Sequence, residues 1–164
     1  MNQVAEPAVE TRIGRLWREL RRGAGMNLLL GHLLGTGDDA LEPGEWDTLE
    51  LLAQQPSWRM GDLARALRVD PSTATRAVQR LISVGYAERT RCMDDRRVAF
   101  VQLTPSGLQR FQVGSRQHHD VMRRLLADFS GAQAEQLADL LQRLVDSLDE
   151  FVAGLDAHDT SHRG

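Results

Sequence analysis

Hydroxyl, amide and guanidinium side chains crowd into residues 70–80, a combination suited to binding a polyanion. Arginine can donate two parallel hydrogen bonds to the edge of guanine, and hydroxyls near a helix start can contact phosphate or bases. On a helix these groups occupy the outward positions, and Arg76 is the best placed to read guanine. The predicted DNA-contacting residues of this segment are Ser72, Thr73, Thr75, Arg76, Gln79 and Arg80.

A second basic pair, Arg96 and Arg97, follows two acidic residues farther along the chain. Long arginine side chains suit a narrow minor groove or its flanking phosphates. Exposed arginines are more often simply solvated, however, and a similar fold can serve as a protein-interaction module. DNA contact and a module without DNA binding therefore stand as alternatives.

The charge of the chain is segregated. The 164 residues carry a net charge of −3, but residues 59–97 hold nine arginines against five acidic residues. Residues 131–164 hold seven acidic residues against two arginines. A basic middle beside an acidic end can present one positive face to phosphates despite the negative total.

Other residues that could do chemistry give weaker patterns. Cys92 lies near several arginines in the sequence, which favour the thiolate, so a redox role and an incidental thiol, the commoner case, stand as alternatives. His118 and His119 are adjacent and would point about 100° apart on a helix, which does not favour a shared metal. No pairing of nucleophile and base, phosphate loop or metal cluster is legible. We therefore expect no enzyme, no cofactor and no metal.

Two tryptophans, Trp17 and Trp46, are candidate walls of a pocket for a small aromatic effector. Both also fall on apolar stripes, where a tryptophan is usually part of the core. Asp47 could accept a hydrogen bond from a polar effector, or could simply be solvated.

The elements that must position these residues follow from apolar periodicity and end signals. Asp70-Pro71 predicts a helix start, Gly85 a left-handed stop, and Thr104 the cap of a later helix. The predicted helices cover residues 9–35, 41–54, 60–67, 70–84, 104–129 and a final one after 131, and the predicted strands cover 86–91 and 98–103.

A mainly α fold with a small β-hairpin wing follows, a winged helix-turn-helix with N- and C-terminal helices for dimerisation. The terminal segments are amphipathic and need apolar cover, which a second copy or a monomeric bundle could supply. The predicted organisation is a disordered arm (1–10), a helical dimerisation region (11–40 and 104–156), a DNA-binding domain (41–103) and a disordered tail (157–164).

Five motifs make the chain resemble the MarR family of bacterial regulators. The resemblance implies a homodimer that binds a pseudo-palindromic operator, usually represses, and often releases DNA when a small, often phenolic, effector binds. It also implies that Asp95 orients Arg97, which enters the minor groove. The motifs are Leu41-Glu42-Pro43-Gly44-Glu45-Trp46, Gly61-Asp62-Leu63-Ala64, Asp70-Pro71-Ser72-Thr73-Ala74-Thr75-Arg76, Asp94-Asp95-Arg96-Arg97 and Leu103-Thr104-Pro105-Ser106-Gly107.

Three departures from the family pattern concern local stability. Glu42 and Arg59 stand where hydroxyl caps are common, and Arg68 stands where a turn-friendly residue is common.

A further alternative is the dimerisation lobe of a transferase whose catalytic chain is separate. The acidic N-terminus and the lack of a long apolar run predict a cytoplasmic protein that does not span a membrane.

Overall fold

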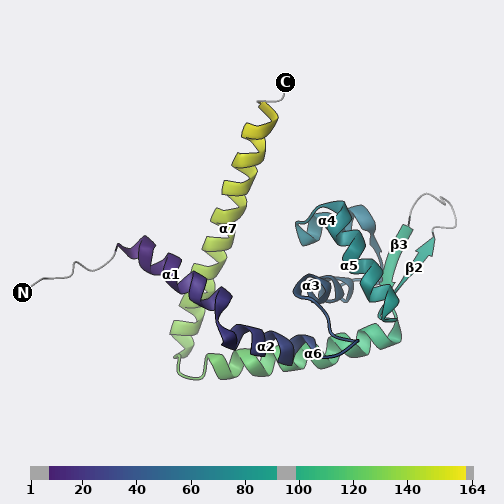
Figure 1. Ribbon diagram of the computed structural model, residues 1–164, viewed down its shortest axis with the longest axis horizontal. Coiled ribbons are helices and arrows are strands. Elements are labelled where there is room, and N and C mark those ends of the chain that lie inside the picture. The colour runs from purple at the N-terminus through teal and green to yellow at the C-terminus, as the bar shows by residue number, and fades with distance from the viewer. Residues whose placement is uncertain (1–7, 92–98, 162–164) are drawn as a thin grey trace, which may run out of the picture. The chain divides into compact units, whose positions relative to one another are not determined.

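The computed structural model describes residues 8–91 and 99–161. The chain divides into two compact units, Met1–His118 and His119–Gly164, and each is described by itself. The elements in chain order (Figure 1) are α1 (Val9–Arg22), α2 (Ala24–Leu34), α3 (Pro43–Leu52), β1 (Trp58–Arg59), α4 (Met60–Leu67), α5 (Pro71–Ser83), β2 (Ala87–Arg91), β3 (Ala99–Leu103), α6 (Pro105–Leu125) and α7 (Gly131–Ser161).

The N-terminal helical segment is broken at Gly23, so the prediction of one helix over residues 9–35 was wrong. Gly23 has extended backbone angles, φ −61° and ψ 137°, between α1 and α2. Glycine has a low helix propensity, and Gly25 follows two residues later. The apolar period continues across the break, which is why periodicity alone did not reveal it.

The core of the first unit lies where α3, α4 and α5 pack together against the small sheet (Figure 1). Each helix contributes a stripe of apolar side chains at helical spacing, which removes them from water. The largest fully buried apolar side chains of this core are Leu49 and Leu52 of α3, Leu63 of α4, Val78 and Leu81 of α5, and Val101 of β3.

Three antiparallel strands form the sheet in the order β1-β3-β2. The hairpin of β2 and β3 was predicted, and its register pairs Arg89 with Val101. The two-residue strand β1 was not predicted, because it consists only of the pairs Trp58 with Val101 and Arg59 with Phe100. A strand this short is defined by its distant partner and leaves no period in the sequence.

Helix ends in this unit follow local chemistry. Gly85 has φ 77° and ends α5 in the left-handed region, as predicted. The hydroxyl of Thr104 accepts a hydrogen bond from the N–H of Gly107 at 3.0 Å, which confirms the predicted cap of α6. Arg68 has φ 56° and ψ 40° after α4, a left-handed conformation that costs a non-glycine residue about 1 kcal/mol. At the start of α3, the N-cap residue Glu42 donates its backbone N–H to the carboxylate of Glu45 at 2.9 Å, which stabilises the first turn.

The outer helices differ from the predicted arm and tail. Helix α1 begins at Val9, inside the predicted arm, and α7 continues to Ser161 across part of the predicted tail. Helix α7 begins with a reciprocal cap, in which Ser130 and Gln133 each accept a backbone N–H of the other, at 3.3 and 2.9 Å. This cap and the absence of proline between residues 131 and 161 favour one long helix.

Candidate nucleic-acid interface

The N-terminus of α5 is built around the carboxylate of Asp70. One of its oxygens accepts the backbone N–H groups of Ser72 and Thr73, at 2.9 and 3.0 Å. Side-chain hydrogen bonds from Ser72 and Thr73 hold the pKa of Asp70 well below its usual range. The carboxylate therefore stays charged and fixes the first turn of the helix, where the macrodipole favours negative charge.

Helix α5 has one buried face and one exposed face. Ala74, Val78 and Leu81 are completely buried against the core. Arg76 and Gln79 are exposed to solvent on the opposite side. The helix therefore presents guanidinium and amide groups outward, the two side-chain types that read guanine and adenine in the major groove.

The threonines of the same turn are partly engaged within the protein. The hydroxyl of Thr73 donates to Asp70 at 2.6 Å, and that of Thr75 donates to the carbonyl of Pro71 at 2.7 Å. Both residues are half-buried, while Ser72 is exposed. Both hydroxyl protons are therefore engaged within the protein. Each hydroxyl oxygen can still accept a hydrogen bond from another group.

Arg80 lies on the same face as Arg76, one turn later, but its guanidinium turns back to the protein. Its Nη2 donates to the backbone carbonyls of Asp38 at 2.6 Å and Ala40 at 3.4 Å. The structure thus separates Arg80 from the other residues predicted to contact DNA.

The wing is described only along its two strands. Gln102 of β3 donates to the carboxylate of Glu88 on β2 at 2.7 Å, which ties the strands together above the core. The predicted wing residues Asp95, Arg96 and Arg97, and Cys92, lie outside the described residues.

The two tryptophans proposed for an effector pocket differ in environment. Trp46 of α3 is 3% exposed and contacts three residues of α6: Phe111, His118 and Arg110. Trp17 of α1 is 56% exposed. The Nε1–H of Trp46 is buried and has no hydrogen-bond acceptor among the described residues. Trp46 is thus a core residue with one unsatisfied donor.

Arg110, a neighbour of Trp46, was not singled out from the sequence. Its guanidinium lies 5.2 Å from the centre of the Trp46 ring and donates to the carbonyls of Leu34 at 3.0 Å and Leu33 at 3.4 Å. Gly114, one turn later on α6, leaves room for the same ring. The only hint in the sequence is an arginine between glycines on an otherwise amphipathic helix.

Two titratable groups near Trp46 are shifted. Burial lowers the pKa of His118, an effect that Arg110 reinforces and that Glu50 and Asp47 oppose. Burial, followed by the charge of Glu50, raises the pKa of Asp47. Each shift favours the neutral form of its side chain.

None of the described helices combines the length and the apolar character needed to cross a membrane. Among the same residues, no group of three or more His, Cys, Asp or Glu side chains is arranged to hold a metal ion.

Comparison with known proteins places this geometry among regulators and not among enzymes. Residues 41–99 match the family model described as MarR family. A putative transcriptional regulatory protein for the hcr operon of Thauera aromatica is 30% identical over 147 residues, covering 87% of this chain and 86% of the relative. The chain spans 65% of the length of two other curated regulators that it matches.

Solved structures share the fold. FabT of Streptococcus pneumoniae, in a complex with DNA, has a TM-score of 0.73 at 21% identity and covers 87% of this chain and 99% of its own. PcaV of Streptomyces coelicolor, in a complex with its natural ligand, has a TM-score of 0.71 at 22% identity and covers 90% and 99%. By the helix-turn-helix, the wing strands and these matches, the chain belongs to the MarR family of winged helix-turn-helix regulators.

Proposed function

We propose that this protein is a homodimeric, sequence-specific DNA-binding transcriptional regulator in which α5 enters the major groove. The observation that carries the proposal is the two-faced helix α5, with Ala74, Val78 and Leu81 buried and Arg76 and Gln79 exposed. The Asp70 cap fixes the first turn of α5, so the outward side chains project from a rigid backbone. A rigid helix loses little entropy on docking.

The wing supplies the second contact in this proposal. Arg96 and Arg97 would reach the minor groove or its phosphates beyond the strands β2 and β3, with Asp95 orienting Arg97. Arginine is favoured in narrow minor grooves because the negative potential is enhanced there. We expect Arg97→Ala to weaken binding about evenly across DNA sequences.

The proposal is tested by measuring the affinity for a promoter fragment obtained by genomic footprinting. We expect Arg76→Ala to weaken operator binding by roughly 1–3 kcal/mol and to relax the preference for guanine at its position. Arg116→Ala is the matched control, because Arg116 is an exposed arginine of α6 and the charge change is the same. Operator affinity and salt dependence of Arg76→Ala equal to those of the parent would favour a protein-interaction module.

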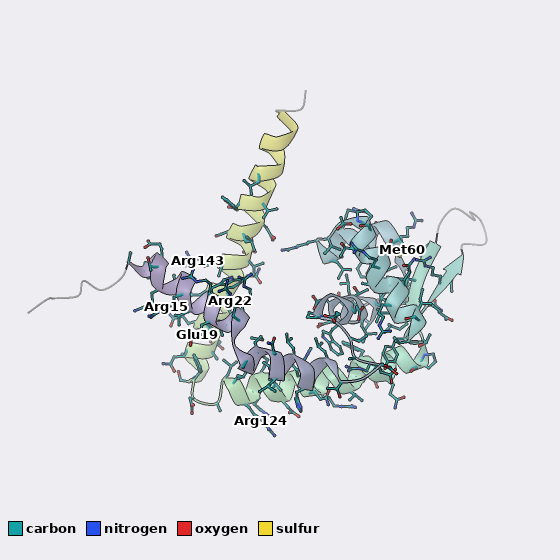
Figure 2. The ribbon with its side chains drawn as sticks, in the orientation of Figure 1. Arg15, Glu19, Arg22, Met60, Arg124 and Arg143 are labelled. Atoms are coloured by element: carbon teal, nitrogen blue, oxygen red, sulfur yellow. The ribbon has the colours of Figure 1, made fainter. Side chains whose placement is uncertain are left out.

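Dimerisation rests on apolar surface that stays open within each unit. On α1, Ile13, Leu16, Trp17 and Leu20 are each at least 48% exposed. The charged residues Arg15, Glu19 and Arg22 belong to the same helix (Figure 2), and helical spacing places them opposite the apolar set. On α7 the exposed apolar side chains are Leu140, Leu141, Leu144, Val145, Leu148, Phe151, Val152 and Leu155. Apolar stripes of this extent mark association surfaces, and we propose a second copy as their partner.

We further propose that the protein is a repressor relieved by a small aromatic effector. Repression is the direction that the resemblance to the family implies. Support for an effector near Trp46 comes from its buried Nε1–H, since a buried donor without an acceptor costs free energy. An effector oxygen that reaches this N–H would remove that cost.

The effector proposal is tested by thermal-shift measurements with phenolic acids and related aromatic molecules. A bound compound should raise the melting temperature of the parent. Trp46→Phe keeps an aromatic ring and removes the N–H, so it should lose most of that shift. A compound that shifts both proteins equally binds elsewhere, and no shift with any of the compounds tested would count against the effector class.

A further inference from the structure

Arg80 occupies a place on α5 from which an arginine could point toward DNA. It follows Arg76 by four residues, which is about one helical turn and puts both on one face. Unlike Arg76, however, Arg80 is half-buried, and its Nη2 donates to the carbonyls of Asp38 and Ala40. The guanidinium of Arg80 is therefore hydrogen-bonded to a residue that lies 42 positions earlier in the sequence.

The carbonyls that accept from Arg80 belong to the loop joining α2 to α3. This loop turns through Gly35 and Gly37, with φ 93° and 87°. It is closed by hydrogen bonds from Ala40 N–H to Gly37 O at 3.2 Å and from Leu41 N–H to Leu34 O at 3.1 Å. Leu34 and Leu41, at its two ends, are buried. The loop thus has a defined conformation and is a firm attachment point.

A second arginine holds the start of the same loop. The Nη2 of Arg110 donates to the carbonyls of Leu33 and Leu34, at the C-terminus of α2, where a helix leaves carbonyls without intrahelical partners. Arg110 belongs to α6 and Arg80 to α5. Helices α5 and α6 are therefore both attached to the α2–α3 loop or its start by guanidinium donors. Charged donors form stronger hydrogen bonds than neutral ones.

We infer that Arg80 is a positioning residue for DNA recognition: its guanidinium fixes α5 to the α2–α3 loop and does not read DNA. The inference rests on the proposed function, because a recognition helix is what Arg80 would hold. Sequence-specific contacts need their side chains within about 0.5 Å and 10–20° of the productive geometry. Binding through phosphates alone tolerates larger errors.

The test compares Arg80→Ala, Arg80→Lys and Arg76→Ala with the parent on the identified operator and on random DNA, over a series of salt concentrations. We expect Arg80→Ala to weaken operator binding roughly fivefold and random-DNA binding less than twofold. The dependence of log affinity on log salt should stay near that of the parent, whereas a lost phosphate contact lowers the slope by about 0.9. Lysine, which can also donate to a carbonyl, should restore part of the loss.

A double-mutant cycle separates positioning from contact. Gly37→Ala strains the loop at φ 87° without a steric clash, because no atom beyond the two neighbouring residues lies within 4 Å of the added Cβ. If Arg80 acts through the loop, the two substitutions together should cost less operator affinity than the sum of their separate effects. Strict additivity, or a salt slope reduced by about 0.9 in Arg80→Ala, would overturn the inference.

Hydrogen exchange without DNA keeps the two proposals distinguishable. Arg80→Ala should speed exchange of the Ala40 and Leu41 amides relative to the parent, and Arg76→Ala should leave them unchanged. Unchanged exchange in Arg80→Ala would overturn the inference while leaving DNA binding intact. Faster exchange in a protein that binds no DNA would instead contradict the proposed function, and with it the role given to Arg80.

Discussion

Trp46 and His118 form a T-shaped contact, edge to face, with ring centroids 4.6 Å apart, where α3 meets α6. Burial is the largest cause of the lowered pKa of His118, and Arg110 acts in the same direction. The folded state therefore prefers the neutral imidazole more strongly than the unfolded chain does. Burial of the His118 imidazole thus makes the stability of this junction sensitive to pH.

The sign of that dependence follows from proton linkage. At pH values above about 6.5, the ordinary histidine value, His118 is neutral in both states and has no effect. As the pH falls below it, the unfolded chain takes up a proton more readily than the folded one, so stability is lost until the lower folded pKa is passed. Because the side chain is partly solvated, we expect a loss below about 1 kcal/mol.

This prediction is checked by denaturant unfolding of the parent, His118→Gln and His119→Gln between pH 5 and 8. His118→Gln should show a smaller loss of stability toward pH 5 than the parent. His119→Gln is the control, because His119 is the exposed neighbour on the same helix. A pH dependence that disappears in His119→Gln and persists in His118→Gln would contradict the assignment.

The sequence predicted where helices start and stop better than it predicted contacts between helices. Asp70, Gly85 and Thr104 mark their boundaries as predicted, because each acts on backbone groups within a few residues. The break at Gly23 was missed, because apolar residues keep their helical spacing on both sides of this glycine. The spacing therefore gives no sign that the helix ends there.

The candidate site was predicted less completely than the fold. The outward positions of Arg76 and Gln79 follow from helical spacing alone. The bonds from Arg80 to Asp38 and from Arg110 to Leu34 join residues 42 and 76 apart, and tertiary packing decides such pairs. Sequence spacing could therefore identify which side of α5 is exposed, but not which of its arginines is engaged within the protein.

Close packing of α3 on α6 gives a prediction at the scale of elements. A Cβ on Gly114 would overlap the Trp46 ring and lie 2.7 Å from Nη1 of Arg110. We expect Gly114→Val to lower the free energy of unfolding by about 2 kcal/mol, because overpacking forces neighbouring groups out of place. Ser115→Val places the same side chain at the next, exposed position of the helix. Equal stabilities of the two variants in chemical denaturation would show that Trp46 can move without cost.

For the whole molecule, operator recognition requires two copies that act together. The apolar faces of α1 and α7 stay open within their own units, and the exposed face of α5 offers only a few base-reading side chains. A pair of recognition helices related by two-fold symmetry would double those contacts and demand a matching symmetry in the DNA. Dimerisation and operator recognition are therefore one proposal at this scale.

Footprinting of the protein on genomic DNA at low ionic strength tests dimerisation and operator recognition together. We expect protection of a pseudo-palindromic site whose two halves lie about one turn of DNA apart, roughly 34–36 Å between centres. Both halves should become protected together as the protein concentration rises. Protection of a single isolated half-site, or no protection of any genomic fragment, would contradict the proposal.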